Sequence, residues 1–366
     1  MRLDVFCRVV DNFGDAGVAW RLARQLAAEH GVEVTLWIDA PATLVRMVEG
    51  FDPARTEALY DGVRIERLDD AADTAVDALP AIVVEAFGCG LPPAYLNRMA
   101  AAPVQPAWIN LEYLSAEPWI ESVHGLPSPH PRLPLTRRFF FPGFTAATGG
   151  LLRERDLFAR RDAFRGVDRA PRPFTVTLFC YPNPALPGLL DAWSSASATL
   201  CRVPEGVATA GLAAWLGRPP PPPGSSTTRG RLTIETVPFG TQDQYDRLLW
   251  GADFNFVRGE DSFVRAQWAA RPLAWHAYPQ SGDAHLVKLD AFLDRYDAGL
   301  ATDAAAAMGA LSRAWNRGDG PAAAAAWPAL HAAHATLREH AERWSAALGA
   351  LPDLAGNLLD FCRNRL

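Results

Sequence analysis

The chain has 366 residues, 49 % of them hydrophobic, and a formal net charge of −6. This length predicts two domains with a sizeable core. The mild negative charge argues against a nucleic-acid-binding protein, which needs a basic surface. None of the five cysteines has C-x-x-C spacing, which argues against a disulfide framework and a cysteine metal site. Without a signal-peptide pattern or a long apolar run, we expect a cytoplasmic protein with no membrane partner.

Apolar runs alternate with helical patterns in the first part of the chain. Residues 3–10 predict a strand, and residues 17–30 predict a helix that Gly31 ends. Further strands are predicted at 32–38, 81–88 and 106–114. This β-α-β alternation predicts a parallel sheet flanked by helices. Frequent prolines in 115–150 predict an irregular segment, of a kind that often has a function.

A second alternation begins near Pro173. Its predicted strands are 174–180, 198–203, 231–239, 253–259 and 272–278, and its predicted helices are 185–196, 206–216, 241–252 and 260–271. The proline-rich run 218–230 predicts a surface loop, and the chain from about 284 is predicted to be helical. The fold class is therefore α/β, with two Rossmann-like domains whose strand ends face a cleft. Glycosyltransferases of the GT-B type, periplasmic binding proteins and kinases all share this architecture, so fold alone does not choose a function.

Two acids follow the first predicted strand, in the sequence DNFGD at 11–15. Aspartate is a favoured N-cap and glycine turns a strand into a helix, so capping alone explains one of the two acids. A cap does not need the second acid. Asp11 and Asp15 are therefore candidates for a general base or a cation-binding pair.

The sequence RGEDS at 258–262 stands at another junction of a strand and a helix. Free N–H groups at a helix N-terminus suit a phosphate, to which Arg258 and Ser262 could add donors. Glu260 and Asp261 could bind sugar hydroxyls or simply favour the helix start. A phosphate site and a plain helix cap both fit this pattern.

Aromatic side chains follow further strands of the second half, at Tyr181, Phe239 and Tyr278. A single aromatic residue at a strand end usually packs in the core, but several converging with Arg258 favour stacking on a nucleobase. His276 is the one histidine predicted near this edge, and a packed side chain is its alternative. The chain has no P-loop, no G-x-G-x-x-G after a strand and no metal-ligand spacing.

Five stretches together resemble the bacterial protein-arginine rhamnosyltransferases. They are DNFGDAGVAWRLARQL, INLEYLSAE, FFFPGFTAATGGLLRE, FCYPN and RGEDSFVRAQWAARPLAWHAYPQ. That family transfers L-rhamnose from dTDP-β-L-rhamnose to one arginine of translation elongation factor P. The resemblance implies a GT-B fold and an inverting reaction that uses neither a metal nor a cofactor.

The resemblance also implies a division of labour. Residues 1–170, with a C-terminal helix at 350–366, would bind the protein acceptor, and residues 171–349 would bind the nucleotide sugar. Asp15 resembles the catalytic base, and Asp11 and Glu260 resemble further essential acids. The implied donor contacts are Tyr181, Phe239, Gln242, Arg258, Asp261, Ser262 and Tyr278. Gln244 is an alternative to Gln242.

The two junctions have opposite charge preferences. The acceptor guanidinium stays protonated, and a pair of carboxylates such as Asp11 and Asp15 can bind its N–H groups in a fork. We expect the later junction to bind the diphosphate. Acidic residues near 112–145 are expected to face basic residues around the target arginine; they are Glu112, Glu117 and Glu121. The alternatives are a GT-B enzyme with a lipid or glycan acceptor and a non-catalytic nucleotide-sugar-binding module.

Overall fold

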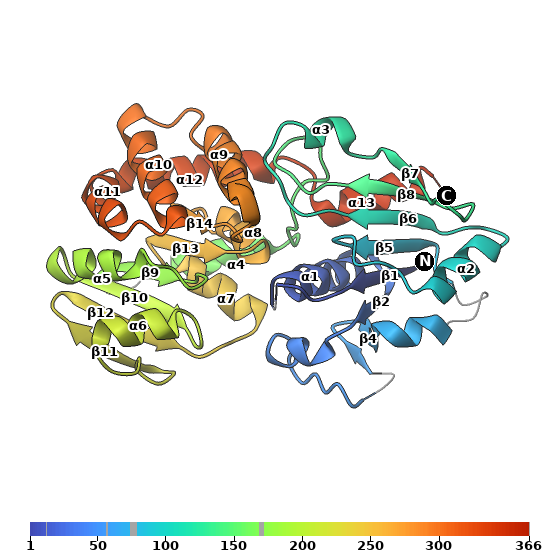
Figure 1. The fold of residues 1–366 in the computed structure, drawn as a ribbon, viewed down its shortest axis with the longest axis horizontal. Coiled ribbons are helices and arrows are strands. Elements are labelled where there is room, and N and C mark those ends of the chain that lie inside the picture. The colour runs from blue at the N-terminus through green and yellow to red at the C-terminus, as the bar shows by residue number, and fades with distance from the viewer. Residues whose placement is uncertain (12, 56–57, 74–78, 168–171, 366) are drawn as a thin grey trace. The chain divides into compact units, whose positions relative to one another are not determined.

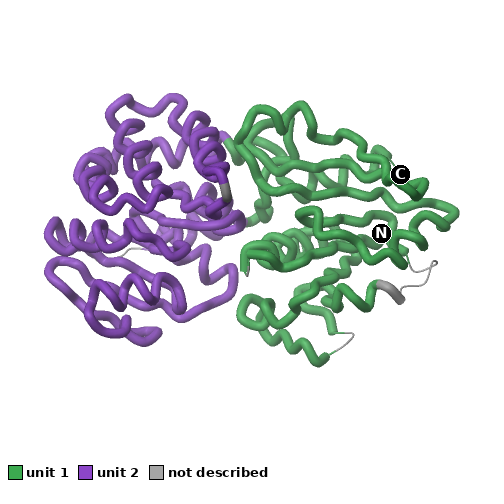
Figure 2. Tube along the Cα trace, viewed as in Figure 1, with its two compact units in different colours: residues 1–156, 348–366 green, residues 157–347 purple. Residues whose placement is uncertain are grey.

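The computed structural model describes the chain apart from residues 12, 56–57, 74–78, 168–171 and 366 (Figure 1). The chain divides into two compact units (Figure 2). Unit 1 comprises residues 1–156 and 348–366, and unit 2 comprises residues 157–347. The predicted boundary between residues 170 and 171 lies outside the described residues.

Unit 1 is built on a sheet in which eight strands are described, in the order β3-β4-β2-β1-β5-β6-β8-β7. The six inner strands are parallel, and the edge strands β3 and β7 are antiparallel to their neighbours. The strands are β1 (Arg2–Cys7), β2 (Glu33–Ile38), β3 (Leu59–Tyr60), β4 (Val63–Arg67), β5 (Ile82–Ala86), β6 (Ala107–Leu111), β7 (Pro127–Pro129) and β8 (Thr136–Phe140). The predicted parallel sheet and its strands near β1, β2, β5 and β6 are confirmed.

The prediction that 115–150 is irregular throughout was wrong. The segment contains the short helix α3 (Ile120–Val123) and the strands β7 and β8, which extend the sheet. The prolines at both ends of β7 are compatible with this because β7 is an edge strand, where an N–H can be missing without breaking a ladder.

The helices of unit 1 include α1, which is longer than predicted. The α-helices are α1 (Phe13–His30), α2 (Pro93–Ala101), α3 and α13 (Leu354–Arg363), with 3₁₀ turns at Pro41–Arg46 and Leu68–Asp73. Gly31 has a φ of 62°, a left-handed conformation that ends α1 as expected. Helix α13 packs against α1, where the Gln25 side-chain amide donates to Asp353 at 3.0 Å.

Unit 2 is built on a second sheet in which six strands are described, in the order β11-β12-β10-β9-β13-β14. All pairs are parallel except β11 with β12. The strands are β9 (Phe174–Leu178), β10 (Thr199–Pro204), β11 (Ser225–Arg229), β12 (Leu232–Val237), β13 (Phe254–Arg258) and β14 (Leu273–His276). The prediction of a loop throughout 218–230 was wrong, because Ser225–Arg229 pairs with β12 as an edge strand. Gly230, with a φ of 61°, makes the tight turn between them.

Unit 2 also contains helices between and after its strands, and those from residue 284 onward confirm the predicted helical pattern. They are α4 (Leu157–Gly166), α5 (Leu186–Ser195), α6 (Thr209–Leu216), α7 (Gln242–Trp250), α8 (Asp261–Trp268), α9 (Ala284–Tyr296), α10 (Thr302–Arg317), α11 (Gly320–Ala332) and α12 (His334–Gly349), with a 3₁₀ turn at Ser281–Asp283. Among the described residues, no helix has the length and hydrophobicity needed to cross a membrane. All five cysteines are free thiols.

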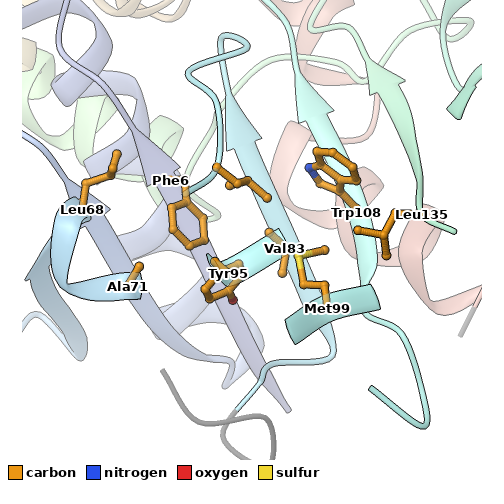
Figure 3. Close-up of a cluster of buried hydrophobic side chains, with 9 residues drawn as sticks. Phe6, Leu68, Ala71, Val83, Tyr95, Met99, Trp108 and Leu135 are labelled. Carbon is orange, nitrogen blue, oxygen red and sulfur yellow. The ribbon is translucent and has the colours of Figure 1, made fainter. Parts of the chain in front are cut away.

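A buried cluster in unit 1 packs side chains of the sheet against α2 (Figure 3). Its members are Phe6, Leu68, Ala71, Val83, Leu91, Tyr95, Met99, Trp108 and Leu135. The Tyr95 hydroxyl donates a 2.7 Å hydrogen bond to Asp4, a carboxylate on β1 that is only 7 % exposed. Burial raises the pKa of Asp4 to about 6, because a charged carboxylate is poorly solvated there.

The raised pKa of Asp4 makes the stability of the protein depend on pH. An unfolded Asp4 loses its proton at lower pH than the folded one, so stability falls as the pH rises to about 6. Asp4→Asn cannot ionise and can still accept the Tyr95 hydrogen bond. We expect its free energy of unfolding in urea, relative to the parent protein, to improve by about 1 kcal/mol between pH 5 and pH 8. Asp69→Asn, at an exposed position of unit 1, controls for the lost charge; equal responses of the two variants would contradict this account.

Candidate active site

The carboxyl end of β1 is a natural ligand site. Strand β1 lies between β2 and β5 and is parallel to both. The chain runs from β1 to β2 and β4 on one side and later continues with β5 on the other, so the strand order reverses next to β1. Ligands bind at such topological switch points in open α/β sheets. Asp11 and Asp15 follow β1 at this edge, Asp15 in the first turn of α1.

Asp15 is a buried carboxylate, 3 % exposed, with well-defined donors. Its Oδ2 accepts hydrogen bonds from the backbone N–H groups of Val10 at 2.8 Å and Asp11 at 2.9 Å. Its Oδ1 accepts the hydroxyl of Tyr113 at 3.3 Å. No described arginine, lysine or histidine forms an ion pair with it. Asp15 thus organises the loop before α1 and also presents an uncompensated negative charge, which suits a cationic ligand.

The Asp11 side chain lies against the first turn of α1. A Cβ atom added at Gly14 would come within 2.7 Å of Oδ2 of Asp11. Within a helix, glycine costs about 1 kcal/mol relative to alanine. With any larger residue at position 14, the Asp11 carboxylate would have to move from this place. Asn12, which follows Asp11 in the sequence and directly precedes α1, lies outside the described residues.

The three glutamates predicted to face the acceptor all have partners nearby. Glu112 accepts the side-chain amide of Asn110 at 2.6 Å, Glu117 accepts the hydroxyl of Ser115 at 2.9 Å, and Glu121 accepts the hydroxyl of Thr145 at 3.1 Å. Of these glutamates, Glu112 directly follows β6, a strand of the same sheet as β1. Their role in acceptor binding stays a prediction.

In unit 2 the switch point lies between β9 and β13. Strand β9 pairs in parallel with β10 on one side and β13 on the other. Tyr181 follows β9 and Arg258 ends β13, so they flank this point. Tyr278 follows β14, next to β13, and Phe239 follows β12, two strands from β9. These four residues therefore belong to the same edge of one parallel sheet.

An aromatic group surrounds Arg258. Its guanidinium carbon lies 4.6 Å from the ring centre of Phe179 and 4.7 Å from that of Tyr181. Tyr278, which is 48 % exposed, meets Tyr181 edge-on at 5.4 Å. These cation–π contacts hold a permanent positive charge at the strand edge. Phe179 was not among the predicted site residues, although it stands in the same FCYPN stretch directly after β9.

The loop from β13 to α8 is held by its own side chains. Ser262 Oγ accepts the Arg258 N–H at 3.1 Å and donates to the Arg258 carbonyl. Trp275 Nε1 donates to the carbonyl of Gly259 at 2.8 Å, and Gly259 has a left-handed φ of 60°. Glu260 immediately precedes α8, and Asp261 is its first residue. The arrangement combines a helix N-terminus with a neighbouring arginine, which suits an anionic ligand.

The two candidate glutamines differ in their surroundings in α7. Thr241 caps this helix, and Gln244 Oε1 accepts the Thr241 N–H at 2.9 Å in a capping box. Gln244 is therefore engaged in the helix start. Gln242 is buried, 6 % exposed, at the first position of α7, and it stays the predicted donor contact.

His276 is a packed side chain rather than an exposed one. It is 4 % exposed and meets the rings of Tyr181 at 5.3 Å and Trp315 at 5.7 Å. Burial, assisted by the charge of Arg258, lowers the pKa of His276 to about 4. The imidazole is consequently neutral at pH 7 and adds no charge to the site.

In the described part of the chain, no group of three or more His, Cys, Asp or Glu side chains is placed to hold a metal ion. Reaction without a metal stays a prediction of the family resemblance. Arg258 and the N-terminus of α8 are positive groups at the carboxyl edge of the unit 2 sheet.

A buried ion pair fixes α8 relative to α7. Arg265 on α8 contacts Asp246 on α7 at 2.8 Å and 2.5 Å, and the two side chains are 0 % and 1 % exposed. This pair joins the middle of α8 to the middle of α7. It supports the site without belonging to it.

Breaking this pair should destabilise unit 2. Arg265→Met removes the buried guanidinium that contacts Asp246, and we expect the free energy of unfolding to fall by about 3–5 kcal/mol. The double variant Arg265→Met/Asp246→Leu should recover most of this loss, because no buried charge remains. Arg247→Ala, at an exposed position of α7, is the control. The stability of all three variants is measured by urea unfolding. If Arg265→Met is as stable as the control, the ion pair does not hold the two helices together.

Comparison with known proteins assigns the family. The family model "Elongation-Factor P (EF-P) rhamnosyltransferase EarP" matches residues 3–363. The protein-arginine rhamnosyltransferase of Pseudomonas putida is 48 % identical, over 99 % of both chains. Both comparisons extend across unit 1 and unit 2.

Solved structures agree on the fold. A structure described as showing EarP-mediated arginine glycosylation of translation elongation factor EF-P is 38 % identical, with a TM-score of 0.69 over 100 % of this chain and 99 % of that one. The spinosyn rhamnosyltransferase SpnG, 13 % identical with a TM-score of 0.51 over 98 % of this chain and 99 % of that one, shares the fold alone. The predicted GT-B fold is confirmed. The chain belongs to the EarP family of glycosyltransferase enzymes.

Proposed function

We propose that this enzyme transfers L-rhamnose from dTDP-β-L-rhamnose to an arginine side chain of translation elongation factor P. The observation that supports it most directly is the buried carboxylate of Asp15, which has hydrogen-bond donors but no described counter-ion, beside Asp11. Such a pair fits a guanidinium better than a neutral sugar hydroxyl or a lipid phosphate. A translation factor as acceptor implies action in the cytoplasm.

In this proposal, unit 1 binds the acceptor and unit 2 binds the donor. Asp11 and Asp15 bind the guanidinium N–H groups and concentrate its positive charge on the nitrogens that do not react. A nitrogen then attacks C1 of the rhamnose, and the bond from C1 to the diphosphate oxygen breaks. The configuration at C1 inverts in this single displacement. Asp15 accepts the proton that the attacking nitrogen releases.

The leaving diphosphate gathers negative charge as the bond breaks. Arg258 and the N–H groups at the start of α8 are fixed in position before the reaction, so they stabilise that charge without reorganising. Tyr181, Phe239, Gln242 and Tyr278 line the same sheet edge and are assigned to the nucleoside. Glu260, Asp261 and Ser262 are assigned to the sugar and diphosphate.

The activity is tested with the purified chain, dTDP-β-L-rhamnose and purified elongation factor P. The proposal predicts that mass spectrometry finds one added deoxyhexose on an arginine of the factor. Asp15→Asn should lower kcat by about 10²–10⁴-fold, because it removes the base. Its amide oxygen can still accept the N–H groups of Val10 and Asp11, so the loop is expected to keep its shape.

Asp39→Asn is the matched control. Asp39 Oδ1 accepts the N–H of Val9 at 2.9 Å and so belongs to the same loop region, but it has no assigned role in catalysis. Full turnover by Asp15→Asn would show that the assigned base is wrong. An unmodified factor in the presence of the parent enzyme would refute the acceptor, and modification of a glycan or lipid instead would support the alternative acceptors.

Donor binding is tested separately by calorimetry with dTDP-β-L-rhamnose. Arg258→Ala removes the positive charge between Phe179 and Tyr181, and we expect the Kd to rise about 10- to 100-fold, the range for a lost charge-assisted hydrogen bond. Arg247→Ala, on the exposed side of α7, should bind the donor normally. An unchanged Kd for Arg258→Ala would remove this residue from the donor site.

A further inference from the structure

Phe87 has an unusual backbone conformation at the carboxyl end of β5. Its φ is 59°, in the left-handed region that a bulky side chain rarely adopts. The Phe87 N–H donates to the Leu111 carbonyl at 2.7 Å, which ties this position to the end of β6. Such strained residues persist where the surroundings hold them, and they concentrate at functional sites.

The strained backbone places the Phe87 ring flat against Tyr113. The ring centres are 4.4 Å apart and the planes differ by 15°. Tyr113 follows β6 and is 40 % exposed, which is high for a large aromatic residue beside a buried carboxylate. Its hydroxyl donates to Asp15 at 3.3 Å. The ends of three neighbouring strands, β1, β5 and β6, therefore meet at one carboxylate and one aromatic stack.

We propose that Tyr113, supported by Phe87, is an aromatic subsite on which the planar guanidinium of the acceptor arginine stacks. This inference rests on the proposed function, because it assumes an arginine acceptor. A guanidinium is flat and weakly hydrated, so it stacks on an aromatic face while its edges donate to carboxylates. In this arrangement Asp15 and Asp11 accept the N–H groups at the edges of the guanidinium, and the Tyr113 ring stacks on its flat face.

The subsite selects arginine over lysine. An ammonium group is compact and strongly hydrated, and it has neither the flat face for Tyr113 nor the fork for two carboxylates. The Tyr113 hydroxyl has a second, positioning role, because its hydrogen bond orients the Asp15 carboxylate. Ring and hydroxyl can therefore be tested separately.

Two variants separate these roles in the rhamnosylation assay with elongation factor P. Tyr113→Leu removes the ring, and we expect the acceptor KM to rise about tenfold or more with an unchanged Kd for dTDP-β-L-rhamnose. Tyr113→Phe keeps the ring and removes the hydroxyl. It should lower kcat but change the acceptor KM little, because the base is less well oriented while the stacking face remains.

Tyr60→Leu is the control, since Tyr60 lies on β3 at the far edge of the same sheet. An acceptor KM for Tyr113→Leu equal to that of the control would overturn the stacking role. If Tyr113→Leu does not fold, Tyr113→Phe decides: an unchanged kcat, or an acceptor KM that rises as much as kcat falls, would overturn the inference. Both results require a parent enzyme that modifies the factor, so failure of the proposed function itself is recognised separately by an inactive parent.

Discussion

The buried negative charge of Asp15 is the constraint on which unit 1 depends. A carboxylate out of water is costly unless donors or a counter-charge compensate it. Two backbone N–H groups and the Tyr113 hydroxyl supply donors, and no described basic side chain supplies a counter-charge. A second acid, Asp11, lies close by, and Gly14 leaves room for its side chain. The fold thus holds two acids together after β1, and in the proposed function a cationic substrate completes this site.

Unit 2 uses the same topology for the opposite charge. Its switch point between β9 and β13 holds Arg258 against two aromatic rings, beside the N-terminus of α8. A helix N-terminus follows the strand in both units, yet in unit 1 carboxylates occupy it and in unit 2 an arginine stands next to it. In the proposed function, this repeated architecture separates recognition of the acceptor guanidinium from recognition of the donor diphosphate.

Strand positions and the acids after β1 were predictable, because apolar runs bounded by turns read as buried strands and parallel strands end at a common edge. Strand β11 was missed because its serines and threonines become a strand only by pairing with β12. The contact of Tyr113 with Asp15, and the stacking of Phe87 on Tyr113, were not predictable. Their meeting depends on the strand order β1-β5-β6 and on a left-handed residue, and neither follows from local sequence.

The central claim is that acids of unit 1 bind the guanidinium while unit 2 binds the diphosphate. A crystal structure of the enzyme with dTDP and an arginine-containing acceptor tests it most directly. The account predicts the guanidinium on the carboxylates of Asp11 and Asp15 and the diphosphate at Arg258 and the start of α8. A diphosphate bound at the β1 edge, or an arginine bound away from Asp15, would contradict it.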